Sequence, residues 1–309
     1  MRVLRGFLDV QHEFDTPAVS IGNFDGVHRG HQAAIMSVVS DARARGCASV
    51  VCTFDPHTRA LLKPNQPPSL MQTLEQRLEA IAAFGVDGIV VIPFSEQVAT
   101  LSREDFVGEF LRDTLNLSAL HVSSYFRFGR FGAGDVAYLQ DLGSARGFDL
   151  TVVPEVLEDG RPISSSWVRQ LIRDGEMEAA AGLLGRPVTL RGSVAQGGKR
   201  GREMGAPTAN LLAENGLLPA PGVYVTRAIL QGEGMPAVTN VGTRPTFGPG
   251  GATTVEAHLL DYRGDLYGQR LDLEFLRKLR EEIEFSSASE LAARIQQDIA
   301  LARAYFNEF

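Results

Sequence analysis

The chain has 309 residues, of which 44% are hydrophobic and 22% are charged, an ordinary composition for a globular protein with room for two domains. A formal net charge of −7 argues against a general nucleic-acid binder, because no surplus of cations is available to neutralise phosphates. No apolar run approaches the ~20 residues of a membrane span, the N-terminus has no secretory signal, and Cys47 and Cys52 are expected to be reduced thiols. We therefore predict a cytoplasmic protein without nucleic-acid or membrane partners.

In the first half of the chain, strand-like apolar runs alternate with segments of helical periodicity. The expected strands cover 18–21, 49–54, 88–92, 119–122 and 150–153, and the expected helices cover 35–44, 73–84, 103–113 and 136–146. This alternation predicts a doubly wound, Rossmann-like parallel sheet with helices on both faces. Ligands of such sheets bind at the carboxyl ends of the strands.

The segment 20–31, S-I-G-N-F-D-G-V-H-R-G-H, follows the first of these strands. His28 and His31 lie one helical turn apart at the expected start of a helix, where backbone N–H groups favour an anion such as phosphate. A solvated helix face is the alternative, and a zinc site is disfavoured because no third ligand is evident. Gly22, Gly26 and Gly30 favour a site, since they let the backbone approach a ligand closely.

Two further polar segments follow expected strands, at 55–58 (D-P-H-T) and 123–130 (S-S-Y-F-R-F-G-R). We expect all three strand ends to face one crevice. A serine cluster then opens a helix within 163–184, with Arg169 in its first turns. The serines are either simple helix caps or, with the arginine, part of a phosphate site.

The pattern changes near residue 185, where glycine becomes dense and short β-type runs follow at 222–230, 235–241, 254–260 and 270–275. These runs predict a small antiparallel barrel, followed by a helix that begins with a capping box of Ser287 and Glu290. We therefore place one domain at 1–185 and a second at 186–309. The glycine-rich stretch 192–205 lacks the Ser or Thr of a Walker A loop after Lys199, so it is either a flexible hairpin or a different phosphate loop.

Taken in order, the motifs resemble those of the prokaryotic bifunctional riboflavin kinase/FAD synthetase family. In the first half these are S-I-G-N-F-D-G-V-H-R-G-H-Q, T-F-D-P-H and I-S-S-S-W-V-R, and in the second half G-G-K-R-G-R-E-M-G-A-P-T-A-N-L, N-V-G-T-R-P-T-F-G and V-E-A-H. The resemblance implies an N-terminal FMN adenylyltransferase domain and a C-terminal riboflavin kinase domain. ATP, riboflavin and FMN would be the substrates, and Mg²⁺ the metal ion.

The resemblance also implies roles for individual residues of the kinase. Glu256 would be the general base, and Thr208 and Asn210 would hold Mg²⁺ against the ATP phosphates. Further kinase residues implied to bind ligand are Gly192, Lys199, Gly201, Gly205, Pro207, Asn240 and Arg280.

In the adenylyltransferase, His28 and His31 would stabilise charge at the α-phosphate, and Arg169, Ser165 and Ser166 would bind the leaving phosphates. The nucleotide loop would include Gly22, Asn23, Phe24, Asp25 and Gly26. Candidates for the flavin side are Phe54, His57, Phe126 and Phe128, although core packing would explain the aromatic residues equally simply.

The chain departs from the family pattern at a few positions. Ser123 and Tyr125 replace a glycine and an Asp or Asn, Ser166 and Trp167 alter the serine motif, and Ala206 replaces an aromatic residue. Two alternatives to the bifunctional enzyme therefore stay open: a kinase whose first domain only binds flavin or nucleotide, and a flavin-binding protein without catalysis. We expect small-molecule partners and a monomer or a weak homo-oligomer.

Overall fold

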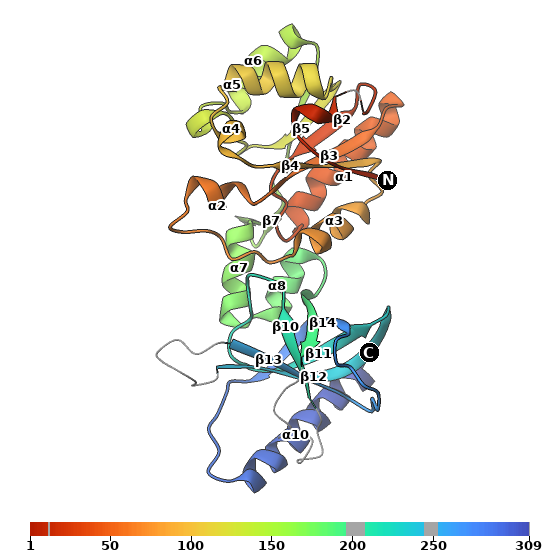
Figure 1. Ribbon diagram of the computed structural model, residues 1–309, viewed down its shortest axis with the longest axis vertical. Coiled ribbons are helices and arrows are strands. Elements are labelled where there is room, and N and C mark those ends of the chain that lie inside the picture. Colours follow the sequence, from red (N-terminus) through yellow and green to blue (C-terminus); the bar gives the residue numbers. More distant parts are fainter. Residues whose placement is uncertain (12, 196–207, 244–252, 309) are drawn as a thin grey trace. The chain divides into compact units, whose positions relative to one another are not determined.

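The computed structural model describes residues 1–11, 13–195, 208–243 and 253–308 (Figure 1). Residue contacts divide the chain into two compact units. The first unit comprises Met1–Pro68 and Leu74–Ser165, and the second comprises Ser69–Thr73 and Ser166–Phe309.

Among the described residues of the first unit, six parallel strands form one sheet. In spatial order they are β1 (Arg2–Arg5), β4 (Gly88–Pro93), β3 (Ser49–Asp55), β2 (Ala18–Ile21), β5 (Ala119–Ser123) and β6 (Asp149–Val153). Strand β2 is followed along the chain by β3 on one side, whereas β5 lies on its other side. The sheet therefore changes winding direction between β2 and β5, where ligands of such folds bind.

Helices cover both faces of this sheet, because successive side chains of its strands point to opposite faces and both sets are apolar. Val50 and Cys52 of β3 contribute to one core cluster and Val51 contributes to the other. All three residues are fully buried. One face packs against η1 (Leu8–Val10), α4 (Glu96–Ala99), the π-helical segment η2 (Phe106–Thr114) and α6 (Val136–Arg146), and the other packs against α1 (Arg29–Arg45) and α3 (Leu74–Ala82). The predicted doubly wound sheet is confirmed.

Several short elements of this unit were not predicted. Strand β1 carries arginine at both ends and three of its four residues are exposed, so it has no apolar run to reveal it. Further examples are η1, α4, α2 (Thr58–Leu62) and the hairpin of β7 (Leu157–Glu158) and β8 (Arg161–Pro162). The predicted helix 103–113 is divided into α5 (Arg103–Asp105) and η2.

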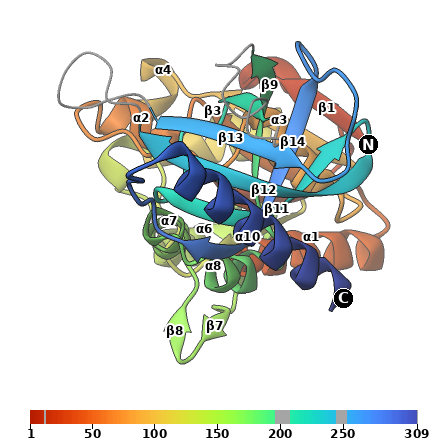
Figure 2. The ribbon, with the colours of Figure 1, turned by 90° about the horizontal axis from the view of Figure 1, so that it is seen from below.

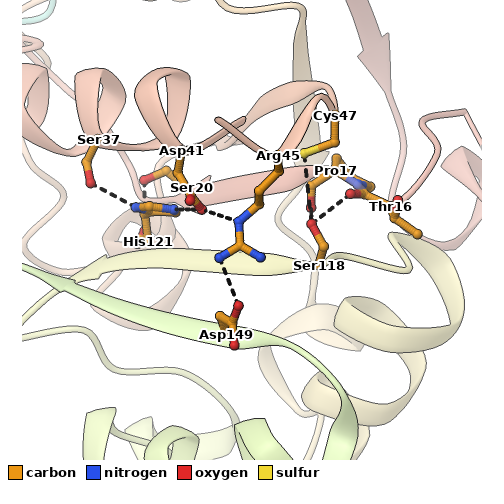
Figure 3. A network of polar contacts seen from close by, with 10 residues as sticks. All are labelled: Thr16, Pro17, Ser20, Ser37, Asp41, Arg45, Cys47, Ser118, His121 and Asp149. Atoms are coloured by element: carbon orange, nitrogen blue, oxygen red, sulfur yellow. Dashed lines mark hydrogen bonds and ion pairs between the residues drawn. The ribbon is translucent and has the colours of Figure 1, made fainter. Parts of the chain in front are cut away.

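A polar network around the buried His121 fastens α1 to the sheet (Figure 3). The imidazole of His121 on β5 lies between two residues of α1, with 2.9 Å from Nδ1 to Ser37 Oγ and 2.9 Å from Nε2 to Asp41 Oδ2. Arg45 Nε donates to Asp41 Oδ2 at 2.8 Å, and its Nη2 lies 2.8 Å from Asp149 Oδ2 on β6. The last three turns of α1 are thereby tied to two neighbouring strands.

The predicted helical segment 163–184 forms two helices, α7 (Ser165–Asp174) and α8 (Met177–Leu184). They are separated at Gly175, whose φ is +80°. Contacts assign residues 166–184 to the second unit. The boundary placed near 185 from the sequence stays a prediction.

The described part of the second unit contains a closed antiparallel barrel of six strands, as predicted. Around the barrel they are β10 (Ala209–Ala213), β13 (Thr253–Leu259), β12 (Glu233–Thr243), β11 (Gly222–Leu230), β14 (Arg270–Arg280) and β9 (Val188–Ala195). Strands β9 and β10 were not predicted because they flank the glycine-rich stretch.

Helix α10 (Ala288–Asn307) lies across strands β12 and β11 of the barrel (Figure 2). It begins at the predicted cap: Ser287 Oγ accepts a hydrogen bond from Glu290 N at 3.2 Å. The Glu290 carboxylate accepts one from Ser286 N at 3.1 Å, one residue before the N-cap N–H that a capping box would use. Val238 and Leu276 of the barrel pack with Ala302 of the helix in one apolar cluster.

Candidate active sites

The loop between β2 and α1 leaves the sheet at its switch point and has an unusual backbone. Phe24, Gly26 and Val27 have φ values of +51°, +88° and +40°, a region that glycine adopts freely and a β-branched valine does not. Phe24 and Val27 are nevertheless buried in the core, and Asp25 between them is only 2% exposed. Such strained conformations persist where surrounding contacts fix the backbone, and they are frequent at functional sites.

His28 and His31 lie together at the start of α1, as the sequence predicted. The two rings stack with centroids 3.7 Å apart, and His28 Nδ1 accepts a hydrogen bond from the backbone N–H of His31 at 3.3 Å. Because Nδ1 is an acceptor, neutral His28 carries its proton on Nε2, which makes that nitrogen a donor. Two imidazoles at a helix N-terminus form a suitable site for an anionic group.

The end of β3 is joined to this loop by hydrogen bonds. Asn23 Nδ2 donates to Thr58 Oγ1 at 3.0 Å, and Asn23 Oδ1 accepts from Thr58 N at 3.1 Å. His57 caps α2, since its Nδ1 accepts from the Arg59 N–H at 3.1 Å. The structure therefore brings together two of the three strand ends that the sequence pointed to.

The third strand end follows β5, which pairs directly with β2. Tyr125 is 66% exposed there, and the neighbouring Glu155 carboxylate, which accepts a hydrogen bond from Ser124 Oγ at 2.8 Å, raises the pKa of the phenol. The bulky side chain that departs from the family pattern thus points into solvent and displaces nothing from the core.

The four flavin-side candidates have different environments. Phe54 and Phe128 belong to the hydrophobic core, Phe126 is half-buried and stacks on Phe128 at 5.6 Å, and His57 is half-buried. Core packing accounts fully for Phe54 and Phe128, so the flavin contact stays a prediction for which Phe126 and His57 retain exposed surface.

The serine motif opens α7, and its second serine, Ser165, reaches the β2–α1 loop. Ser165 Oγ donates to the carbonyl oxygen of Asp25 at 2.9 Å, which joins two motifs that are 140 residues apart. Ser166 lies exposed in the first turn of α7. Arg169 is buried within the second unit, where its Nε donates to the Ser69 carbonyl at 3.1 Å.

In the barrel, three polar residues lie side by side on adjacent strands. Asn210 on β10 pairs with Glu256 on β13, and Glu256 pairs in turn with Asn240 on β12. Their sequence neighbours Ala209 and Val255 are buried, so the three side chains share the outer face of the barrel. Thr208 precedes β10 and is half-buried. A carboxylate beside hydroxyl and amide oxygens is a donor set suited to a hard divalent cation.

Other predicted kinase residues have different placements. Lys199, Gly201, Gly205 and Pro207 lie outside the described residues. Gly192 lies within β9, not in a loop, and a Cβ there would collide with the Leu212 carbonyl oxygen of β10. Arg280 donates from Nη2 to Asp298 Oδ2 at 2.7 Å, and both side chains are largely buried. This partner on α10 gives Arg280 a structural role, and its ligand contact stays a prediction.

Comparison with known proteins identifies the family. The FAD synthetase profile matches residues 10–167 and the riboflavin kinase profile matches residues 184–306. A bifunctional riboflavin kinase/FMN adenylyltransferase of Pseudomonas fluorescens is 37% identical over 98% of this chain and 97% of its own length. The chain belongs to this family. Proteins of the same name from Escherichia coli K12 and Bacillus subtilis are 36% and 32% identical, and at least 95% of each chain is covered in both comparisons.

A solved structure supports the same architecture. A Streptococcus pneumoniae protein described as a macrolide-efflux protein matches with a TM-score of 0.89 and 27% identity, covering 97% of this chain and 98% of its own. The fold of this solved structure therefore matches that of the present chain over nearly its whole length.

Two features are absent from the described residues. No helix there is long and apolar enough to cross a membrane. No group of three or more His, Cys, Asp and Glu side chains in that part of the chain is arranged to hold a metal ion. The oxygen donors near Glu256 include amide and hydroxyl groups and are therefore not a cluster of that kind.

One residue with contacts to the first site was not predicted. Arg77 lies inside the expected helix 73–84, yet its guanidinium is buried and reaches the β2–α1 loop. A charged residue in an amphipathic helix is usually exposed, so the sequence carried no signal for it.

Proposed function

We propose that this chain makes FAD from riboflavin in two ATP-dependent steps, as the names of its relatives describe. The second unit phosphorylates riboflavin to FMN, and the first unit transfers an adenylyl group from ATP to FMN. The observation that carries the kinase step is the row of Asn210, Glu256 and Asn240 on one face of three paired strands. The stacked pair of His28 and His31 at the start of α1 carries the second step.

In the kinase step, the Glu256 carboxylate accepts the proton of the terminal ribityl hydroxyl group of riboflavin. The oxygen of that hydroxyl attacks the γ-phosphorus of ATP, and ADP leaves. Thr208 and Asn210 offer the oxygen donors that Mg²⁺ prefers, and Asn210 pairs with Glu256 across adjacent strands, so they are the residues that would hold it. When bound, the ion neutralises charge on the phosphates. Asn240, on the other side of Glu256, orients the carboxylate or the hydroxyl.

In the adenylyl step, a phosphate oxygen of FMN attacks the α-phosphorus of ATP, and the bond to the β-phosphate breaks to release pyrophosphate. No covalent enzyme intermediate is required. His28, a donor through Nε2, and His31 stabilise the charge that develops on the α-phosphate. The N-terminus of α1 adds its backbone dipole to the same position. Ser165, which belongs to the same unit as the histidines, binds the leaving phosphates. For Ser166 and Arg169 the same role rests on the family resemblance alone.

Tyr125 does not favour the alternative that the chain is only a kinase. Its side chain is exposed and displaces nothing from the hydrophobic core. Cys47 and Cys52 are free thiols, which agrees with a reducing compartment, so we place the reactions in the cytoplasm with small molecules as partners.

Incubation of the purified protein with riboflavin, ATP and Mg²⁺ tests the proposal, with the flavins separated by chromatography over time. We expect FMN to appear first and FAD to follow. FMN that accumulates without FAD, even when FMN and ATP are supplied directly, would reduce the function to the kinase step. No conversion of riboflavin would refute both.

A further inference from the structure

Arg77 of α3 is a buried cation placed between the two strand ends of the adenylyl-transfer site. Its side chain is 4% exposed. Nη1 donates to the carbonyl oxygen of Asn23 at 2.9 Å, and Nη2 donates to the carbonyl oxygen of Phe54 at 2.9 Å. One guanidinium thus links the first residues of the β2–α1 loop to the end of β3.

The Asn23 end of that link is fixed from several sides. Its carbonyl oxygen also accepts from Thr53 Oγ1 at 3.0 Å, and its side chain makes the two hydrogen bonds to Thr58 described above. Arg77 differs from these partners because it belongs to helix α3 and not to either of the two loops. Its helix is anchored in the core through Ile81, so the guanidinium transmits a rigid position to Asn23.

The charge of Arg77 is matched within the same loops. Burial lowers the pKa of this guanidinium, and the carboxylates of Asp25 and Asp55 act in the opposite direction. A buried cation is unfavourable unless it is paired and hydrogen-bonded, and removing one partner leaves the other charge uncompensated. Asp25 is itself buried in the strained part of the loop, so two opposite charges lie in the same buried region.

The segment that follows Asn23 delivers the two histidines. Phe24, Gly26 and Val27 hold the left-handed backbone angles given above, and His28 comes directly after them as the cap of α1. Strained backbone of this kind keeps its shape only while its surroundings determine it. A shift at Asn23 would be passed to the imidazoles, and small displacements of catalytic groups lower rates steeply.

We propose that Arg77 is a positioning residue for adenylyl transfer: it holds the β2–α1 loop and the end of β3 in the spacing that places His28 and His31 at the α-phosphate. This inference rests on the proposed function of the first unit. It assigns no contact between Arg77 and substrate.

The test compares Arg77→Met, which keeps the length of the side chain but removes its charge and its donors, with the unaltered protein. FMN, ATP and Mg²⁺ are supplied, and kcat and KM for FAD formation are measured per folded chain. We expect kcat to fall by about a hundredfold. Riboflavin phosphorylation by the same preparation should stay within about twofold, because its residues belong to the other unit, and it serves as the internal standard.

Ile81→Val is the matched control, since it loosens the core cluster under the same helix while the guanidinium and its two carbonyl partners are left in place. A merely structural role would lower the amount of folded protein in both variants and leave kcat per folded chain unchanged. Arg77→Lys keeps the charge but not the forked donor geometry. It should restore part of the rate, to about a tenfold deficit.

Each outcome is decisive. A folded Arg77→Met with an unchanged kcat for FAD formation overturns the inference while leaving the proposed function intact. If Arg77→Met does not fold, Arg77→Lys decides in its place: a fall in kcat at normal KM supports the positioning role, and a normal kcat overturns it. An unaltered protein that makes FMN but no FAD overturns the proposed adenylyl transfer, and this inference with it.

Discussion

At the scale of single residues, Glu256 has the most specific role, because its carboxylate is placed between Asn210 and Asn240 by the register of three strands. Glu256→Gln keeps the shape and removes the base. We expect riboflavin phosphorylation to fall by about 10²- to 10⁴-fold. FAD formation from supplied FMN should not change. Chromatographic assays of both reactions on one preparation measure this.

Glu274→Gln is the control for that substitution, since Glu274 also lies on a barrel strand and its Oε2 pairs with Arg227 Nη1 at 3.3 Å instead of facing the row. It should leave both reactions intact. Unchanged FMN formation by Glu256→Gln would remove the base assignment and would favour binding without proton transfer by this residue.

Functional residues that stand in recognisable motifs could be predicted from the sequence. Residues that act through hydrogen bonds to backbone atoms could not. His28, His31, Asn210 and Glu256 stand in motifs, and the structure groups them as two sets. Arg77 donates to two carbonyl oxygens, which no sequence pattern marks. Gly192 was expected in a loop, although close backbone packing inside β9 explains it.

At the scale of elements, strands were predictable where both faces are buried. Strand β3 reads as a continuous apolar run because its alternate residues enter two cores. Strand β1 is mostly exposed, and β10 is short and adjoins the glycine-rich stretch, so neither shows a clear period. These strands were missed because their own sequences lack a clear hydrophobic pattern. The sheet and the barrel to which they belong are of the classes that the sequence predicted.

The attachment of α1 to the sheet should depend on pH through Asp41. Partial burial alone would raise the pKa of this carboxyl, but hydrogen bonds from His121 and Arg45 outweigh it and lower the pKa below the usual value. The folded state therefore binds this proton less readily than the unfolded chain does. Its contribution to stability is complete above the ordinary carboxyl pKa of about 4 and is lost as the pH falls through the lower folded value.

Urea unfolding of the first unit, measured between pH 7 and pH 3, tests this. Asp41→Asn should cost about 1–2 kcal/mol at pH 7, because a charge-assisted hydrogen bond becomes a neutral one. It should also reduce the fall in the free energy of unfolding below about pH 4. A variant with the same acid dependence as the unaltered protein would show that other carboxyl groups determine it.

At the scale of the whole molecule, the second unit includes residues that precede the barrel in the sequence and form hydrogen bonds with it. Asn215 Nδ2 donates to the Met71 carbonyl at 2.8 Å, and Leu217 N donates to the Leu70 carbonyl at 2.9 Å. Helix α8 contacts β14 and β9, and Arg277 Nε donates to Glu178 Oε1 at 2.8 Å. The composition change at 185 marks where the barrel sequence begins, which need not be where its folding unit begins.

Two fragments separate these possibilities. Residues 186–309 follow the boundary predicted from composition, and residues 166–309 add α7 and α8. Met177, Leu183 and Leu184 of α8 are buried, and each contributes roughly 1.5–3 kcal/mol of transfer free energy, an upper estimate. We expect 166–309 to unfold cooperatively in urea with a free energy of unfolding higher by roughly 3 kcal/mol or more, and to keep more kinase activity. Equal unfolding midpoints would instead establish the boundary near 185 as the limit of an independent kinase domain, with α7 and α8 acting as a connection that the barrel does not need.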